Sequence, residues 1–310
     1  MAITGTGTEQ DPFIVHSYDE IVEAFGCHNG TADMYYSKLA TDIDCNDYGA
    51  GWEWESIIIA NNGSTAAERT ANTLDLDGHT IKNIYIKNGN MVFYKANGTV
   101  DYGCVKNGKI LNVFGNSPTS FTNGITLENL SISLQFGTPS YNVFSNDKIT
   151  NCAIYAIVMN LGSYPLISYS VVGTIKNLDL YCELYGLTGS SAAIFRSTSN
   201  TPIIDSVRCK GKLVSYTPSN PTKVSWVSTK AINSVFDVDM TSFVFPEGST
   251  GTKLLLAAGD NTTVVNTSIM NGSGEPLFVL PNGYLQATSE QMTVGSELRG
   301  LGFLVVNVEE

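Results

Sequence analysis

The stretch Ile81-Lys-Asn-Ile-Tyr-Ile86 decides the fold of this chain, because the same six-residue phrase returns with variation over about 180 further residues. Positions one, four and six of the phrase are mostly apolar, position two is mostly polar, and position three is Asn or Ser. The copies begin 22 to 32 residues apart, a spacing typical of stacked structural repeats. The further copies start at Val105, Leu127, Ile149, Ile175, Ile204, Ile232 and Val264.

The phrase predicts two short strands that meet at a bend on its third residue. Side chains on a strand alternate between its two faces, so apolar positions one, four and six cannot share one face of a straight strand. Asn suits a bend because it tolerates the left-handed conformation and its amide can hydrogen-bond locally. We therefore expect stacked coils to align these side chains in one column, each amide bonding to the next. The expected column comprises Asn83, Asn107, Asn129, Asn151 and Asn177.

Coils of this length, built from short β-rich runs broken by Gly, Asn and Ser, are typical of a right-handed parallel β-helix. A leucine-rich repeat has a similar period but needs leucines at set positions, which these coils lack. The capping box Ser17-Tyr-Asp-Glu20 predicts a short helix that covers the open end of the solenoid. We expect an entry strand and capping helix over 1–34, the β-helix over 35–270, and a C-terminal β cap or oligomer contact over 271–310.

Stacking also predicts neighbours on the outside of the solenoid. Opposite charges would face each other on adjacent coils, an arrangement that favours a structural role for these side chains. Apolar Phe236 and Val265 fall at nominally outward positions of the late copies, which indicates either subunit packing or a register error in these copies. We expect the chain to assemble as a homotrimer. The predicted charge pairs are Lys106 with Glu128, Lys176 with Asp205, and Asp179 with Arg208.

Composition narrows the class of protein. The 310 residues are 43% hydrophobic and only 15% charged, so the chain has material for a long core. A net charge of −12 argues against nucleic acid or an anionic membrane as a partner. No apolar run would span a bilayer and no secretory leader is recognisable, which favours synthesis in a reducing cytoplasm. The six cysteines show no C-x-x-C spacing, and Cys152 and Cys209 are expected to be buried free thiols.

The opening of the chain resembles a known group of β-helical proteins. The phrases are Gly5-Thr-Gly-Thr-Glu-Gln-Asp-Pro-Phe-Ile-Val15, Tyr36-Ser-Lys-Leu-Ala-Thr-Asp-Ile-Asp44, Trp54-Glu-Ser-Ile57 and Leu76-Asp-Gly-His-Thr-Ile-Lys-Asn-Ile84. They look like the start of glycine-rich GLUG-type proteins and of β-helical spike, fibre and decoration proteins of tailed bacteriophages and prophages. The match covers roughly residues 3–90. It implies a virion protein, made in the bacterial host cytoplasm, that assembles with other virion proteins and contacts host-surface polysaccharide.

Two carboxylate pairs could support glycoside cleavage. Asp75 and Asp77, like Asp237 and Asp239, stand two residues apart, so on a strand they would share a face at about 7 Å. That separation is compatible with a glycosidase pair. The acidic residues are dispersed, however, so the pattern favours a non-enzymatic protein, with no catalytic, cofactor or metal residue assigned. A polysaccharide depolymerase, acting as hydrolase or lyase, is the main alternative, and a bacterial surface adhesin module is the second.

The sequence holds other candidate ligands, each of which has a plainer structural interpretation. Asp42-x-Asp44-x-Asn46 with Glu53 approaches a calcium loop, but Asp47 replaces the required Gly, which favours a strand with outward carboxylates. The histidines His16, His28 and His79 form no triad or metal pattern. Loops at 189–191 and 218–221 are expected to project. Aromatic side chains suited to sugar stacking are Tyr164, Tyr169, Tyr181, Tyr185, Tyr216 and Trp226.

Overall fold

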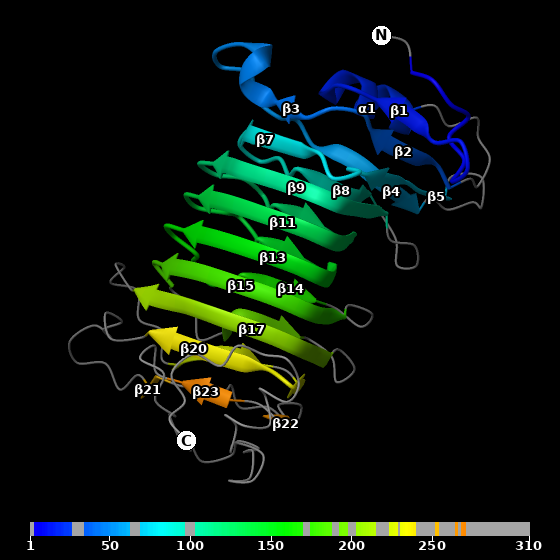
Figure 1. Ribbon diagram of the computed structural model, residues 1–310. Coiled ribbons are helices and arrows are strands. Elements are labelled where there is room, and N and C mark those ends of the chain that lie inside the picture. Colours follow the sequence, from blue (N-terminus) through cyan, green and yellow to red (C-terminus); the bar gives the residue numbers. More distant parts are fainter. Residues whose placement is uncertain are drawn as a thin grey trace.

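The computed structural model shows a chain wound into stacked coils, with strands running side by side from one end of the molecule to the other (Figure 1). It describes residues 3–26, 34–62, 69–96, 103–169, 174–187, 192–197, 203–214, 223–228 and 230–239, and three short strands beyond them. Almost every pairing between described strands is parallel, so the prediction of a parallel β-solenoid is confirmed. The expected C-terminal cap over 271–310 lies outside the described residues.

Two sheets make up the described solenoid. Among the described pairs of the second sheet, only β4 (Ile57–Asn62) with β5 (Arg69–Ala71) is antiparallel. The first sheet contains β1 (Phe13–Val15), β2 (Tyr36–Leu39), β3 (Ile43–Asp44), β6 (Thr73–Asp75), β7 (Thr80–Tyr85), β9 (Cys104–Gly115), β11 (Thr126–Phe136), β13 (Lys148–Val158), β15 (Ile175–Tyr185), β17 (Ile203–Val214), β19 (Lys230–Ile232), β20 (Val235–Asp239), β22 (Val264–Val265) and β23 (Ser268–Met270). The second contains β4 (Ile57–Asn62), β5 (Arg69–Ala71), β8 (Phe93–Ala96), β10 (Thr122–Asn123), β12 (Phe144–Ser145), β14 (Ile167–Tyr169), β16 (Ala192–Ser197), β18 (Lys223–Ser228) and β21 (Thr252–Lys253).

The third residue of the phrase bends the long strands as predicted. It takes a positive φ of 51° to 60° in six copies, the left-handed region that Asn tolerates best, and in the copy expected to start at Ile232 the left-handed residue is Asn233 at 50°. The Asn129 amide donates to Asn107 Oδ1 at 2.9 Å and accepts from Asn151 Nδ2 at 3.2 Å, and Asn177 continues the column at 2.8 Å. The column of amides from Asn107 to Asn177 is therefore confirmed.

Asn83 does not belong to that column, so its predicted place was wrong. Its amide donates to Asp44 Oδ1 at 2.8 Å, and its own Oδ1 accepts from Asn112 at 3.1 Å, which forms a second, separate column. The Asn107 amide donates instead to Asp75. A turn at Asp77 makes the first full coil two residues longer than its neighbour between equivalent positions. Ile81 therefore pairs with Ile110, the last residue of the second copy, and not with Val105, its first.

This turn also explains a glycine in the second copy of the phrase. Gly108 occupies position four, where other copies place an inward apolar side chain. A Cβ at Gly108 would lie 2.4 Å from the Leu76 Cβ and 2.5 Å from the His79 carbonyl oxygen. The fully buried Leu76 side chain fills the space that a residue at 108 would otherwise take.

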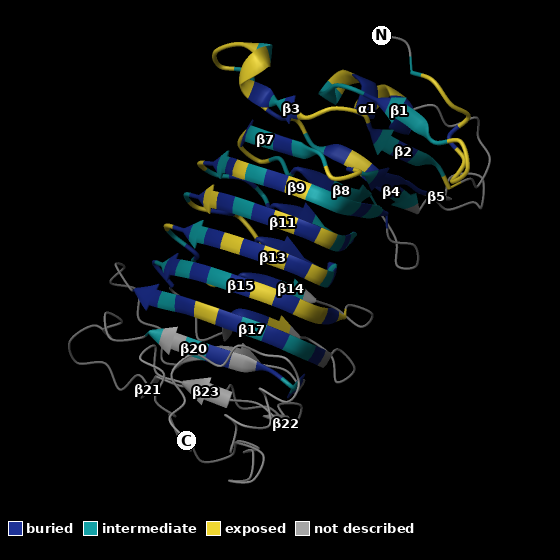
Figure 2. Ribbon diagram, in the orientation of Figure 1, coloured by how far each residue is buried: buried dark blue, intermediate teal, exposed yellow. Residues whose placement is uncertain are grey.

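The core lies between the two sheets and extends along the solenoid. Along β11 and β13, buried and more exposed residues alternate on either side of the bend, as Figure 2 shows. Burying this apolar area is the main stabilising term, at roughly 25 cal/mol for each Å². Trp54 is completely buried and donates its indole N–H to the Val92 carbonyl oxygen at 3.1 Å. The Cys152 and Cys209 thiols are free and buried as predicted, and burial raises the pKa of Cys152 to about 11.

Helix α1 (Tyr18–Gly26) lies beside the first coils at the N-terminal end (Figure 1). Ser17 Oγ accepts from the Glu20 N–H at 3.2 Å, which is the expected cap. Glu20 reaches back to the His16 N–H at 2.7 Å, one residue before the cap. Ile21 and Phe25 are buried against the core. The helix exists where predicted, and β1 already pairs with β2, so parallel pairing begins within segment 1–34.

The outward register agrees with the sequence for the three charge pairs, which are adjacent residues on neighbouring strands. Phe236 is an exception: only 1% of it is exposed, and its ring packs edge-on against Phe195 at 5.9 Å. Its pairing with Cys209 shows that the phrase in this coil begins at Ala231, one residue earlier than predicted. The prediction that Phe236 faces outward was wrong, and the side chain of Val265 lies outside the described residues.

A buried carboxyl group stabilises the corner between β12 and β13. Asp147 is 1% exposed and accepts from Thr122 Oγ1 at 2.7 Å and from the Ile125 N–H at 3.0 Å. Burial raises its pKa to about 7, and these hydrogen bonds oppose the rise.

Candidate functional site

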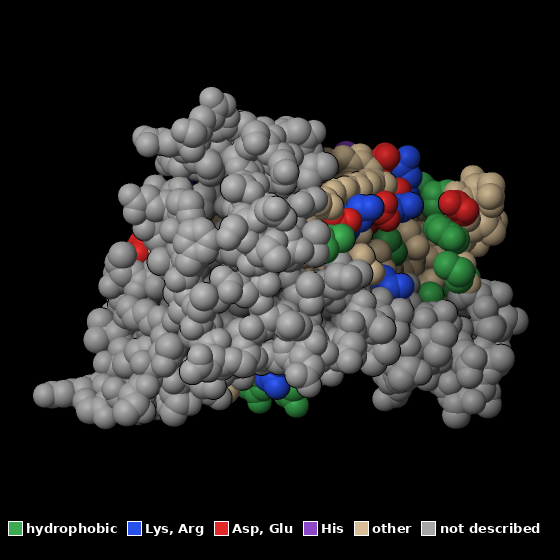
Figure 3. Space-filling view, turned by 90° about the horizontal axis from the view of Figure 1, so that it is seen from below, with side chains coloured by type: hydrophobic (Ala, Val, Ile, Leu, Met, Phe, Trp, Pro, Cys, Tyr) green, Lys and Arg blue, Asp and Glu red, His purple; other side chains and the backbone are tan. Residues whose placement is uncertain are grey.

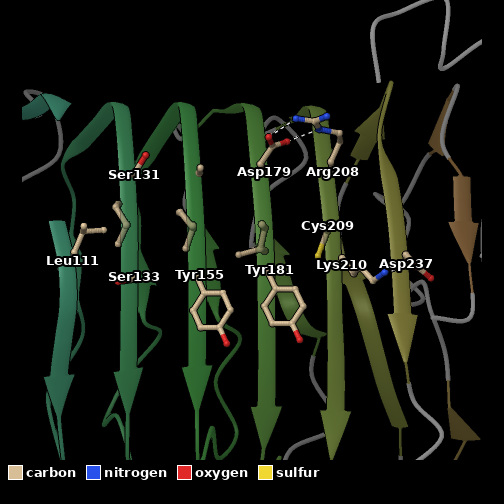
Figure 4. Close-up of a pocket in the computed structure, with 14 residues that line it drawn as sticks. Leu111, Ser131, Ser133, Tyr155, Asp179, Tyr181, Arg208, Cys209, Lys210 and Asp237 are labelled. Carbon is tan, nitrogen blue, oxygen red and sulfur yellow. Dashed lines mark hydrogen bonds and ion pairs between the residues drawn. The ribbon is translucent and has the colours of Figure 1, made fainter. Parts of the chain in front are cut away.

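A groove of about 620 Å³ runs across the outer face of the first sheet, over β11, β13, β15, β17 and β20 (Figure 4). It begins at β9, where Leu111 lines one end. The side chains that shape it are Ser131, Ser133, Ala153, Tyr155, Asp179, Tyr181, Arg208, Lys210 and Asp237.

The bends place these side chains. Outward positions recur two and four residues after each left-handed residue, because side chains alternate along the strand. The first row runs Ser131, Ala153, Asp179 and Arg208, and the second runs Ser133, Tyr155, Tyr181, Lys210 and Asp237. The groove lies between the two rows. On each strand, the residue that separates the rows points its side chain into the core, and these positions form the floor of the groove.

Two tyrosines form one wall of the groove. The rings of Tyr155 and Tyr181 stack with centroids 5.0 Å apart and an angle of 6° between their planes. Figure 4 shows them side by side on neighbouring strands. Ser133 is the residue opposite Tyr155 on β11, and it is too short to cover a phenol ring. One face of Tyr155, which is 44% exposed, is therefore open to the groove.

A carboxylate fixes the orientation of the second ring. Glu183 accepts from Tyr181 Oη at 2.9 Å through one oxygen and from Tyr185 Oη at 2.8 Å through the other. The bond to Glu183 raises the pKa of Tyr181 to about 12, with burial as the next cause. Tyr181 therefore stays protonated near neutral pH and is unsuited to act as a general base. The Tyr181 ring is held in a fixed orientation before a ligand binds, so less conformational entropy is lost on binding.

Paired charges form the opposite wall. The Arg208 guanidinium donates through Nε and Nη2 to the two carboxylate oxygens of Asp179, as the dashed lines in Figure 4 mark. Lys210 Nζ lies 3.8 Å from Asp237 Oδ2 at the end of the groove. Figure 3 shows basic, acidic and hydrophobic side chains next to one another on the described surface seen from below. Two cations and two carboxylates line the groove, so its local charge balances although the chain carries −12.

The predicted pair Asp75 and Asp77 is not a site of this kind. Asp75 ends β6 and Asp77 lies in the following turn at φ 48°, so the two do not alternate on one strand. Asp75 accepts from the Asn107 amide at 3.0 Å and from the Asp77 N–H at 2.9 Å. Asp77 lies 2.9 Å from Lys38 Nζ. Both carboxylates therefore stabilise the turn.

The pair Asp237 and Asp239 does lie on one strand, at alternate positions of β20. Asp237 reaches the groove, while Asp239 is opposite Lys212 one row further along and does not line it. Among the candidate carboxylates from the sequence, Asp237 is thus the one that the structure brings to the groove.

The calcium-like segment uses its carboxylates for internal bonds. Asp42 accepts from the Thr80 N–H at 3.0 Å and from His79 Nδ1 at 3.1 Å, and the Thr80 bond is the main reason its pKa is lowered. Asp44 accepts from the Asn83 amide and lies 3.2 Å from Lys82 Nζ. Within the described ranges, no three His, Cys, Asp or Glu side chains gather as metal ligands.

The remaining predicted candidates have separate places. His16 bonds to Glu20, and His28 lies outside the described residues. Tyr164 is exposed and stacks on Tyr141 at 5.2 Å, away from the groove. Tyr185 does not line the groove itself, but its hydrogen bond to Glu183 places it beside the groove. The side chains of Tyr169, Tyr216 and Trp226 and the loops at 189–191 and 218–221 lie outside the described residues.

Tyr155 is a residue of the candidate site that the phrase did not reveal. It follows the left-handed Asn151 by four positions, and Tyr181 follows Asn177 by the same number. A search beyond the sixth position of the phrase, at a fixed offset from each bend, would have found this pair. Of the residues that shape the groove, Asp179 and Arg208 were predicted as neighbours, and Tyr181 was predicted as a sugar-stacking ring.

Comparisons with known proteins add little to this geometry. No protein-family model matches the chain, and no curated protein matches it. A crystal structure of a protein assigned provisionally as an immunoglobulin A1 protease, from Bacteroides ovatus, aligns with a TM-score of 0.40 and 17% identity. The alignment covers 91% of this chain and 83% of that one. Values this low define neither a shared fold nor a shared activity. In the described part of the chain, no helix is long and apolar enough to span a bilayer.

Proposed function

We propose that this chain is a non-enzymatic, right-handed parallel β-helix that binds a neutral bacterial surface polysaccharide in the Tyr155 groove, as a spike, fibre or decoration component of a bacteriophage virion. The observation that carries the binding proposal is the stacked pair of Tyr155 and Tyr181, one face of which is open. Sugar rings present C–H groups that pack against aromatic faces, and polar side chains around such a platform fix the orientation of the ligand.

The polar wall supplies partners for sugar hydroxyl groups. Ser131 can donate and accept, and Arg208 can donate through the N–H groups that its ion pair leaves unused. Surface ion pairs add only about 0–1 kcal/mol to stability, so holding Arg208 and Asp179 in fixed positions favours a role in recognition. Balanced charge in the groove favours a neutral glycan, because an anionic polymer would meet the overall negative potential of the chain.

The other parts of the proposal have separate support. Parallel connections within one sheet are right-handed in about 98% of cases, which supports the handedness. The phrases within residues 3–90 support a virion and assembly with other virion proteins. We also propose a homotrimer, and a mass of three chains in solution by light scattering is its test.

Binding is tested on a printed array of purified capsular and O-antigen polysaccharides, neutral and acidic. We expect the wild-type chain to bind neutral polymers and Tyr155→Ala to lose affinity at least tenfold, whereas Tyr155→Phe keeps it. Tyr141→Ala is the matched control, since Tyr141 is an exposed, stacked tyrosine that does not line the groove. Equal binding by Tyr155→Ala and wild type would refute the groove, and no binding to any neutral polymer would refute the proposed function.

A depolymerase is the second candidate, because Asp237 reaches the groove. Glycosidases need one carboxyl group that gives a proton and a second that acts as base or nucleophile. Asp179, the other carboxylate there, has both oxygens engaged by Arg208, so neither is free to face a substrate. The test is incubation with the array-positive polysaccharide and measurement of new reducing ends and unsaturated sugars. Release that disappears in Asp237→Asn would establish the enzyme in place of the binding protein.

A further inference from the structure

A second hollow of about 410 Å³ lies on the same outer face, nearer the N-terminal end. Tyr85 on β7 and Phe114 on β9 form a stacked pair there, with centroids 5.3 Å apart and an angle of 25° between the planes. Tyr85 is 50% exposed. The molecule thus repeats, at a second place, the arrangement of two parallel rings on neighbouring coils.

The polar side chains around this second pair are mostly amides. Asn88, Asn116 and Gln135 line the hollow, and Glu53 is the charged residue of the lining. Amides both donate and accept hydrogen bonds, as sugar hydroxyl groups do, and they carry no charge. This chemistry fits a neutral sugar and offers no cation that would hold an acidic one.

Strand register connects the two sites. Phe114 is opposite Gln135, which is opposite Ile157, and Tyr155 precedes Ile157 by two residues on β13. Strands lie about 4.8 Å apart and residues rise about 3.3 Å, so Phe114 and Tyr155 are roughly 12 Å apart. Four strand steps separate Tyr85 from Tyr181, a span of roughly 20 Å.

We infer that one linear, neutral oligosaccharide segment occupies both sites at once and crosses the sheet obliquely from Tyr85 to Tyr181. A hexose unit is about as long as the strand spacing of roughly 4.8 Å, so about five units cover the span. Gln135 and Ser133 lie between the ring pairs, where they can bond to the middle units. This inference rests on the proposed function and adds the second site and the minimum length of the ligand.

The probe is a size-fractionated partial acid hydrolysate, two to eight sugar units long, of the neutral array polysaccharide that wild type binds most tightly. Affinity is measured by isothermal titration calorimetry on the full chain. We expect affinity to rise steeply up to about five units and then level off. Phe114→Ala should weaken binding of hexamers about tenfold and leave dimers unchanged, because short chains need only one site. Tyr155→Ala should weaken both, and Tyr141→Ala neither.

Two results would disprove the second site without disproving the proposed function. If dimers bind as tightly as hexamers, or if Phe114→Ala matches wild type on hexamers while Tyr155→Ala loses binding, the second site is wrong and the Tyr155 groove stands. Circular dichroism of Phe114→Ala checks that the fold is intact, and Phe114→Tyr, which keeps the ring, should bind as wild type does. If no fragment or polymer binds, the proposed function itself fails.

Discussion

The column of amides at the bend makes a quantitative prediction for Asn129. Its side chain donates one hydrogen bond along the column and accepts another, and its backbone has a φ of 52°. Asn129→Gly removes both bonds but keeps the left-handed conformation available. At about 0.5–1.5 kcal/mol for each bond, lowered by exposure, we expect a loss of about 1–2 kcal/mol in the free energy of unfolding.

Asn129→Ala removes the same bonds and also forces an alanine into the left-handed region. That conformation costs about 1–2 kcal/mol for a residue with a Cβ. We expect a total loss of about 2–4 kcal/mol for Asn129→Ala. The control is Glu128→Ala, the preceding outward residue on β11, which should change stability by less than about 0.5 kcal/mol.

The assay is urea unfolding of the three variants, followed by far-ultraviolet circular dichroism. The order wild type, Glu128→Ala, Asn129→Gly, Asn129→Ala is the result that the structure requires. If Asn129→Gly and Asn129→Ala lose the same stability, backbone strain at the bend does not contribute. If neither differs from Glu128→Ala, the amide column contributes nothing measurable.

Two further substitutions test the packing and the buried acid. Gly108→Ala should lower the free energy of unfolding by about 1–3 kcal/mol, because its Cβ would overlap Leu76, and thermal denaturation measures this loss. Asp147 has a folded-state pKa of about 7, above its ordinary value, so its stabilising contribution is complete below about pH 4 and is lost as pH rises to 7. Relative to Asp147→Asn, wild type should lose up to about 1.4 kcal/mol for each pH unit in that window, measured by urea unfolding at several pH values.

Both predictions have clear opposing results. A thermal midpoint for Gly108→Ala equal to that of wild type would argue against the proposed overlap, because the added Cβ would then be accommodated without cost. Parallel stability curves for wild type and Asp147→Asn between pH 4 and 7 would show that the Asp147 carboxyl group titrates alike in the folded and unfolded chain.

The bends were predictable from sequence because they depend on local chemistry. An Asn or Ser inside an apolar phrase signals a left-handed residue without knowledge of any neighbour. The register between coils depends on residues far apart in the sequence. Its prediction failed where the local pattern was ambiguous. The turn at Asp77 moved Asn83 to another column, and Ala231 and Ile232 both suited the first position of a late copy.

The groove was predicted only in part, since it lies on outward positions that the core does not constrain. Arg208 and Asp179 emerged as neighbours because opposite charges at equal positions are visible in the sequence. Tyr155 lies beyond the sixth position, where the phrase has no pattern. The open face of the Tyr155 ring depends on the short Ser133 side chain beside it. These two residues become neighbours only when the coils stack.

The corners between strands explain why this chain can vary in length from coil to coil while its faces remain regular. The extra residues of the first full coil are accommodated at Asp77 and Gly78, and Leu74 and Ile81 on either side still pair with the next coil. Lengthening a corner therefore leaves the rows of outward side chains aligned. A lineage of such proteins could gain or lose whole loops at its corners while the spacing of the ring pairs on the sheet stays fixed.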